Sequence, residues 1–223
     1  MELENVTRLS VGASWQGAFP KTYWEHFNLL ELPAEKLATV KRRTVVNWYG
    51  DDQAKTLVVP FMPALDSGVV DTVMFDSVAP FTTFASSTIV MMQVANHIRP
   101  TKANRERIRQ SLEFLSRNGL SVALSAEGLW SLEELIELAA ETASRVVVDP
   151  LDEEVMEGEV EAPFYYRIKG RRGFQNQLTD HELHLVHQRV QDEEAYVSFG
   201  LPGFWSDALR FNRLLQQQDD FWG

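Results

Sequence analysis

The chain alternates between short apolar runs and longer amphipathic runs along most of its length. Eight runs rich in Val, Ile and Leu have the length and composition of buried strands: 7–14, 28–33, 56–63, 88–95, 121–127, 145–150, 164–170 and 195–200. Helical patterns lie between several of them. Parallel neighbours in a sheet require long crossover connections, so the alternation predicts a mostly parallel sheet covered by helices.

Three helical segments carry start signals that can be recognised in the sequence. The segments are 101–118, 131–142 and 179–191. Ser131 and Glu134 have the spacing of a capping box, in which each residue binds the backbone N–H of the other. Thr179 and Glu182 repeat this spacing, and Thr101 is a suitable N-cap residue. We therefore expect helices to begin at these three positions.

The eight strand-helix units predict an α/β fold, a compact (β/α)8 TIM-like barrel formed by residues 1–223 as one domain. Such a barrel usually takes about 250 residues, so some helices should be short or irregular. An open, doubly wound sheet is the alternative architecture. Residues 47–86 show no clear helical period, and we interpret much of this segment as irregular loops with one short helix. The acidic segment 151–162 is interpreted as a solvated loop.

Charge and residue usage exclude several classes of function. The formal net charge of -11 disfavours binding to nucleic acid and to acidic membranes. The chain contains no cysteine, which excludes disulfides, thiolate nucleophiles and Cys-ligated zinc. No run has the length needed to cross a bilayer, and the first residues lack the apolar core of a signal peptide. We expect a soluble, cytoplasmic protein.

A cluster of cations follows the strand predicted at 164–170. Arg167 and Lys169 should point to the same side of this strand because side chains alternate, and Arg171 lies in the loop after it. Ligands of a barrel are met at the carboxyl ends of its strands. An arginine offers a two-pronged donor and a lysine a point charge, so we predict that Arg167, Lys169 and Arg171 bind an anionic ligand. Pairing of these cations with acidic helices is the alternative.

Two carboxylates at the ends of predicted strands are the candidate acid and base catalysts. Glu31 and Asp149 would both face the pocket mouth, where burial shifts a carboxyl pKa. The alternatives are an ion pair between Glu31 and a cation such as Arg167, and a turn cap for Asp149. Trp15, in the first loop, is predicted either to stack on a ligand or to cover the barrel end.

No metal or cofactor motif is present. His181, His184 and His187 have a spacing of three residues, but a helix here would be peripheral, and we expect no metal site. The glycine-rich phosphate loops GxGxxG and GxxxxGK[ST] do not occur, and neither does GxSxG. The sequence therefore assigns no cofactor and gives serine hydrolysis little support.

The order of the motifs resembles the YecE-like TIM-barrel family, a domain of unknown function (number 72). The run VGASWQGAF is similar to the first strand and loop of that family, FNLLELP to its second strand with Glu31, and FYYRIKGRRG to its seventh. The resemblance implies a TIM barrel of uncharacterised activity. The chain departs from the family at the ends of the third and fifth strands, where TLVVPFMP and VALSAEG lack the usual Lys and Glu-Phe-Arg-His. It would therefore be a divergent member.

Three functions are compatible with these features. The first is binding of a small anionic, phosphorylated ligand at the carboxyl ends of the strands, with Glu31 or Asp149 available for acid-base chemistry. The second is a degenerate barrel without catalysis that acts as a binding or scaffold protein. The third is recognition of a nucleic-acid backbone through residues 167–172. The sequence does not decide whether the protein is an enzyme.

Overall fold

The eight strands of the chain form one closed parallel barrel. The protein is described by a computed structural model that covers residues 8–14, 22–41, 43–44, 47, 55–63, 75–76, 78–79, 87–152, 163–169, 177–190, 194–200 and 205–222. The strands are β1 (Arg8–Ser14), β2 (Leu29–Glu31), β3 (Thr56–Phe61), β4 (Ser87–Val94), β5 (Ser121–Ala126), β6 (Arg145–Val148), β7 (Phe164–Ile168) and β8 (Glu194–Phe199). They are ordered β1 to β8 and closed on themselves, which confirms the predicted (β/α)8 barrel and excludes the open sheet.

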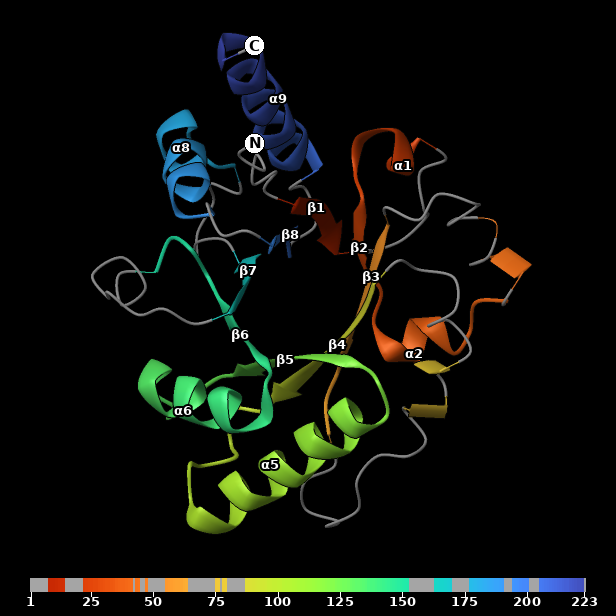
Figure 1. Cartoon of the computed structure of the whole chain (residues 1–223), viewed down its shortest axis with the longest axis vertical. Helices are drawn as coiled ribbons and strands as arrows, with labels where there is room; N and C mark the ends of the chain where they lie inside the picture. The colour runs from red at the N-terminus through yellow and green to blue at the C-terminus, as the bar shows by residue number, and fades with distance from the viewer. Residues whose placement is uncertain are drawn as a thin grey trace, which may run out of the picture. The chain divides into compact units, whose positions relative to one another are not determined.

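Helices separate many of the strands in sequence. The described helices include α1 (Tyr23–His26), α2 (Ala34–Leu37), α5 (Lys102–Arg117), α6 (Leu132–Thr142), α8 (Asp180–Arg189) and α9 (Trp205–Trp222) (Figure 1). The helices α1 and α2 have only 4 residues each, as expected for a barrel in a chain of this length. Among the helices of the described residues, none combines the length and apolarity that a membrane span requires. Most of segments 47–86 and 151–162 lies outside the described residues.

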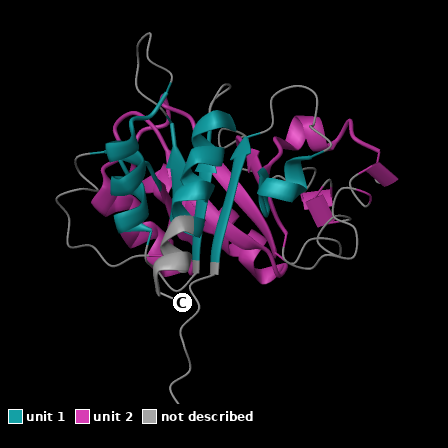
Figure 2. Ribbon diagram, turned by 90° about the horizontal axis from the view of Figure 1, so that it is seen from above, with its two compact units in different colours: residues 1–30, 148–160, 165–223 teal, residues 31–147, 161–164 magenta. Residues whose placement is uncertain are grey.

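The residues group into two compact units (Figure 2). Unit 1 consists of residues 1–30, 148–160 and 165–223, and unit 2 of residues 31–147 and 161–164. Unit 1 therefore contains β1, β8, α8 and α9, with nearly all of β7. Unit 2 contains β3, β4 and β5 with α5 and α6. Each unit is described below by itself.

The predicted helix starts are confirmed by their hydrogen bonds. The Ser131 hydroxyl accepts the Glu134 N–H at 3.2 Å, and the Glu134 carboxylate accepts the Ser131 N–H at 3.1 Å. Thr179 and Glu182 form the same reciprocal pair, at 3.2 and 2.8 Å. The Thr101 hydroxyl accepts the N–H three residues further on at 3.3 Å. These bonds satisfy backbone donors that the first turn of a helix leaves without partners.

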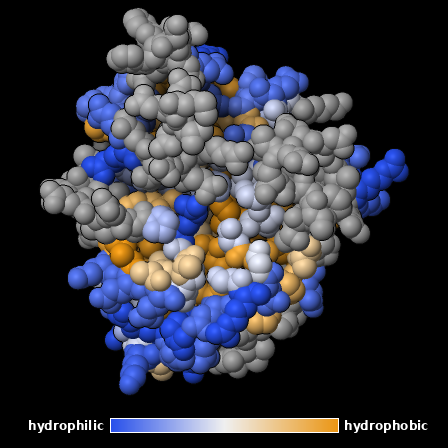
Figure 3. Space-filling view, viewed as in Figure 1, coloured by the Kyte–Doolittle hydropathy of each residue, from blue (hydrophilic) through white to orange (hydrophobic). Residues whose placement is uncertain are grey.

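In unit 2 the strands are apolar and the helices carry the charge. All six residues of β3 are buried, and β3, β4 and β5 pair in parallel register. The helices α5 and α6 lie side by side (Figure 1), joined by Arg105, which donates to Glu134 at 3.3 Å and to Glu137 at 2.8 Å. Hydrophilic side chains gather over this part of the surface (Figure 3). The helices thus shield an apolar sheet from water.

In unit 1 the helices α8 and α9 pack against the outer face of β7 and β8. The ring of Phe199 in β8 lies 5.9 Å from that of Phe211 in α9. The Tyr166 hydroxyl in β7 donates to the carbonyl of Arg189, the last residue of α8, at 3.2 Å. Because side chains alternate along a strand, the residues next to Tyr166 and Phe199 belong to the inner face.

Side chains add hydrogen bonds to the backbone pairing between β1 and the start of β2. The Tyr23 hydroxyl accepts the Ala13 N–H at 2.8 Å and donates to the Leu29 carbonyl at 2.5 Å. Gly12 permits this approach, because a Cβ atom there would lie 1.8 Å from the Leu29 oxygen and 2.9 Å from the Tyr23 hydroxyl. A backbone without a side chain is therefore required at position 12.

Candidate functional site

The cations at the end of β7 lie on the inner face of unit 1. Arg167 is opposite Ser198 of β8, and Ser198 is opposite Gly12 of β1. Tyr166 and Ile168, which alternate with Arg167 and Lys169, are buried on the outer side at 4% and 0% exposure. The side chains of Arg167 and Lys169 are partly exposed. The structure thus brings a guanidinium and an ammonium to the carboxyl ends of neighbouring parallel strands.

Two stacked tyrosines lie below Arg167 on this inner face. The rings of Tyr165 in β7 and Tyr196 in β8 are 6.3 Å apart and inclined by only 16°. Both residues are buried, at 0% and 5% exposure. Each precedes a polar residue of the same face by two positions, Arg167 in β7 and Ser198 in β8. The inner face is therefore filled by aromatic rings at one level and carries polar groups at the next level toward the carboxyl ends.

The guanidinium of Arg167 is held between the ends of β1 and β8. Its Nη2 atom donates to the hydroxyl of Ser14, the last residue of β1, at 3.4 Å. The Gly200 N–H donates to the Ile168 carbonyl at 2.9 Å, which closes the end of β8 onto β7. A Cβ atom at position 200 would lie 3.4 Å from Arg167 Nε and 3.2 Å from the Ile168 oxygen. The Arg167 side chain thus lies within van der Waals contact of position 200, next to the end of β8.

Asp149, predicted as a catalytic carboxylate, connects the ends of β6 and β7. Its Oδ1 atom accepts the Leu151 N–H at 3.0 Å, and its Oδ2 atom accepts the Lys169 N–H at 2.8 Å. The first bond is the turn cap that the sequence offered as the alternative. Burial raises the pKa of Asp149, while the two N–H donors and the Lys169 charge oppose this effect. A catalytic role for Asp149 stays a prediction.

The remaining predicted site residues are Glu31, Trp15 and Arg171. Glu31 is the last residue of β2, is fully buried and belongs to unit 2. Its predicted role in catalysis stays a prediction. Trp15 and Arg171 lie outside the described residues. The candidate site of unit 1 is therefore formed by Arg167 and Lys169, with Ser14 and Asp149 as their described partners.

Sequence reasoning missed the contributions of Ser14, Ser198 and Gly200 to this site. A serine or glycine at the end of an apolar run carries no signal of function on its own. The signal that could have found them is strand register, because Ser198 lies opposite both Arg167 and Gly12. Register depends on which strands pair, and the sequence alone does not supply it.

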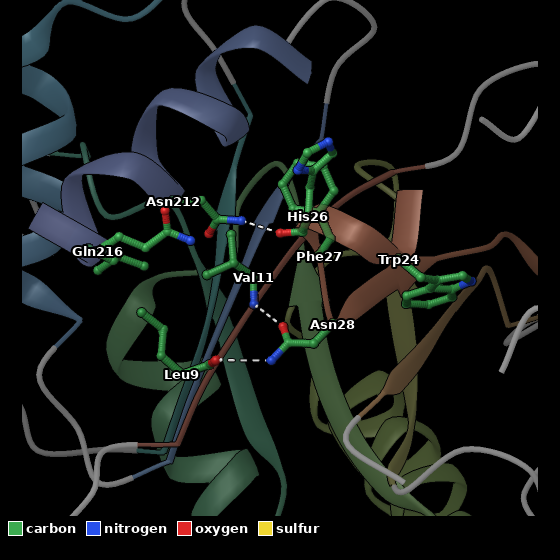
Figure 4. Close-up of a pocket in the computed structure, with 9 residues that line it drawn as sticks. Leu9, Val11, Trp24, His26, Phe27, Asn28, Asn212 and Gln216 are labelled. Atoms are coloured by element: carbon green, nitrogen blue, oxygen red, sulfur yellow. Dashed lines mark hydrogen bonds between the residues drawn. The ribbon is translucent and has the colours of Figure 1, made fainter. Parts of the chain in front are cut away.

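A separate cavity of about 300 Å³ lies beside α1 and α9 in unit 1 (Figure 4). It is lined by Leu9, Val11, Trp24, His26, Phe27, Asn28, Asn212, Leu215 and Gln216. Asn28 accepts the Val11 N–H at 2.8 Å and donates to the Leu9 carbonyl at 3.3 Å, and Asn212 donates to the His26 carbonyl. The side-chain amides of Asn28 and Asn212 thus hold β1 and α9 in place. Of the predicted site residues that the structure describes, none lines this cavity.

The described residues offer no constellation of metal ligands. Within the described ranges, no group of three or more His, Cys, Asp or Glu side chains is arranged to hold a metal ion. On α8, the pKa of His187 is lowered by burial and by the charge of His184. The spacing of three residues places His184 and His187 on one side of the helix.

The fold of the chain is similar to that of several solved barrels. A protein of the domain of unknown function 72 family from Enterococcus faecalis V583 matches with a TM-score of 0.58 at 14% identity, over 94% of each chain. D-psicose 3-epimerase from Clostridium cellulolyticum H10, solved with D-tagatose, matches with a TM-score of 0.55 at 12% identity, over 95% of this chain and 97% of that one. Another D-psicose 3-epimerase structure, determined in the presence of D-fructose, gives 0.51 at 11% identity, over 91% and 89%.

These similarities concern the fold. A domain of unknown function 72 protein is among the matched structures, which confirms the resemblance drawn from motif order at the level of the barrel. No protein-family model matches the sequence, and no curated protein matches it. Identities of 11 to 14% show a shared architecture and leave the activity open.

Proposed function

We propose that unit 1 binds a small phosphorylated ligand at the carboxyl ends of β1, β7 and β8. The observation that carries this proposal is the position of Arg167, on the inner face and directed to the neutral hydroxyl of Ser14. Lys169 adds a second positive charge two residues further along the chain and on the same side. We propose that both cations bind the same phosphate group.

The surroundings of the cations support a built site. The Gly200 N–H joins the end of β8 to Ile168 of β7, and Asp149 fixes the backbone of Lys169 by accepting its N–H. Such positioning lowers the conformational entropy lost when a ligand is bound. Carboxyl ends of barrel strands are also the part of this architecture that meets ligands.

The neighbouring structures suggest a class of probe. The matched D-psicose 3-epimerases were solved with D-tagatose and in the presence of D-fructose. A ketohexose phosphate combines this sugar class with the charge that Arg167 and Lys169 would bind. If the barrel also catalyses a reaction, Glu31 and Asp149 are the carboxylates predicted to move protons.

The proposal is tested by thermal unfolding and calorimetric titration with D-fructose 6-phosphate, inorganic phosphate and uncharged D-fructose. We expect the phosphorylated probes to raise the Tm of the wild type, because a ligand that binds only the native state stabilises it. In Arg167→Gln/Lys169→Gln the affinity should fall at least tenfold. The matched control is Arg99→Gln/Lys102→Gln, which removes one exposed arginine and one exposed lysine. Equal binding by both double variants would refute the proposal.

The two alternatives give different results in the same experiment. A barrel without a ligand site should show no saturable shift with any phosphorylated probe. Binding to a nucleic-acid backbone should favour a single-stranded oligonucleotide over inorganic phosphate and weaken steeply with added salt. The proposed site should show the opposite preference, because it is built around one arginine and one lysine.

A further inference from the structure

A second pair of polar side chains lies at the carboxyl ends of β4 and β5, in unit 2. These strands are parallel, and Gln93 is opposite Ser125 in their register. Register partners in a parallel pair point to the same side of the sheet. The residues that alternate with them, Met92, Val94 and Leu124, are apolar and buried.

Packing of the helices places Gln93 and Ser125 on the inner face. Both α5 and α6 pack against β5. The face of β5 that meets them is the apolar one, formed by Val122 and Leu124, which are buried at 3% and 0% exposure. Ser125 and its register partner Gln93 must then lie on the opposite, inner face.

Both side chains retain unused hydrogen-bonding capacity. Over the ranges that the structure describes, neither the Gln93 carboxamide nor the Ser125 hydroxyl forms a hydrogen bond with another protein group. Ser125 is nevertheless buried, at 5% exposure. Its hydroxyl oxygen is not among the buried polar atoms that lack a partner, so this oxygen is open to solvent and accessible to a ligand.

The chemistry of the pair selects a neutral ligand rich in hydroxyl groups. A carboxamide and a hydroxyl each donate and accept, and neither carries a charge. Neighbouring strands are about 4.8 Å apart, so each group can bind one of two adjacent ligand hydroxyls. Ala123, two residues before Ser125 on the same face, is buried and small. A nucleobase would require a stacking partner, and neither ring of the pair described in this unit, Phe75 with Phe114, belongs to these strands.

We propose that Gln93 and Ser125 form a hydrogen-bonding subsite for a neutral polyhydroxylated compound of the hexose or hexitol class. The subsite belongs to unit 2, involves no charged group and does not depend on the proposed role of Arg167 and Lys169. Its two residues act directly on the ligand, Gln93 through its carboxamide and Ser125 through its hydroxyl.

The test is calorimetric titration of the full chain with a panel of uncharged aldohexoses, ketohexoses and hexitols. The variant is Gln93→Met/Ser125→Ala, which removes the polar atoms and nearly preserves side-chain size. The matched control is Gln110→Met/Ser121→Ala, because Gln110 is exposed on α5 and Ser121 is exposed at the start of β5. At least one compound should bind the wild type. The control should bind this compound with an affinity within twofold of the wild type, and the affinity of the variant should be at least tenfold lower. Absence of binding by the wild type, or equal binding by the variant, overturns the proposal.

A second measurement keeps the proposal testable if the variant is unstable. In the wild type, saturation with the bound sugar should shift the side-chain amide resonances of Gln93 in the nitrogen-proton NMR spectrum and leave those of Gln110 unchanged. Unchanged Gln93 resonances overturn the subsite. Arg167→Gln/Lys169→Gln should bind the neutral sugar as the wild type does, so loss of phosphate binding alone counts only against the function proposed for unit 1.

Discussion

Asp149 has a structural role at the candidate site. Its two carboxylate oxygens accept the N–H groups of Leu151 and Lys169, so it orders the ends of β6 and β7. The residue is buried, and this burial is the main cause of its raised pKa. A carboxylate that is both desolvated and bonded to backbone groups should affect stability even if it takes no part in chemistry.

Replacement of Asp149 by asparagine should lower stability and remove a pH dependence. The amide cannot accept both N–H donors, which should cost about 1–3 kcal/mol at pH 7. Because the folded-state pKa is raised above 3.8, the folded wild type binds the proton more tightly than the unfolded chain does. The stability of the wild type relative to Asp149→Asn should therefore decrease as pH rises from about 3.8 through the folded-state pKa. Urea unfolding of both proteins at a series of pH values measures this difference, and a constant difference would contradict the assignment.

Gly12 should tolerate no side chain. A Cβ atom would lie 1.8 Å from the Leu29 oxygen, so Gly12→Ala should destabilise the protein by at least about 4 kcal/mol or prevent folding. Gly119→Ala is the control, because its φ of +79° is strained for alanine while no atom lies within 4 Å of the new Cβ. That variant should lose only about 1 kcal/mol. Similar Tm values for the two variants would mean that β1 and the start of β2 are not packed as described.

At the scale of single elements, the sequence predicted the strands and the capped helices well. Their signals are local: a run of β-branched residues, or a serine three residues before a glutamate. The junction between β1 and the start of β2 could not be predicted in this way, since Tyr23 and Asn28 add side-chain hydrogen bonds to the backbone pairing. The pairing of Gln93 with Ser125 was missed for a related reason, because a single polar residue in an apolar run gains meaning only from its register partner.

The candidate site was predicted in part. The alternation of side chains in β7 correctly placed Arg167 on one side and Tyr166 on the other, because it follows from strand geometry. The turn cap by Asp149 follows from local chemistry in the same way. Which strands bring Ser14 to Arg167 depends on barrel closure, and that information is spread over the whole chain.

The capping boxes provide a test at the same scale. Thr179→Ala removes the acceptor for the Glu182 N–H and should lower stability by about 1 kcal/mol. Thr179→Ser should retain most of the stability because its hydroxyl can accept the same bond. Chemical denaturation measures both variants, and an equal loss in the two would argue against a capping role for the hydroxyl.

At the scale of the whole molecule, the net charge and the local cations have opposite signs. The formal charge of -11 repels large polyanions, while the site proposed at Arg167 and Lys169 would bind a small anion at the strand ends. The chain should therefore bind a compact phosphate compound in preference to a nucleic acid. A gel-shift titration with a 20-nucleotide single strand should give no complex in about 0.15 M salt, and a stable complex would favour the nucleic-acid alternative.

A crystal structure of the protein with D-fructose 6-phosphate would test the central claim most directly. The account predicts density for the phosphate within hydrogen-bond distance of the Arg167 guanidinium, with the Lys169 ammonium also directed at it. Phosphate density bound away from both side chains, or an empty position beside Arg167 at saturating ligand, would contradict the account.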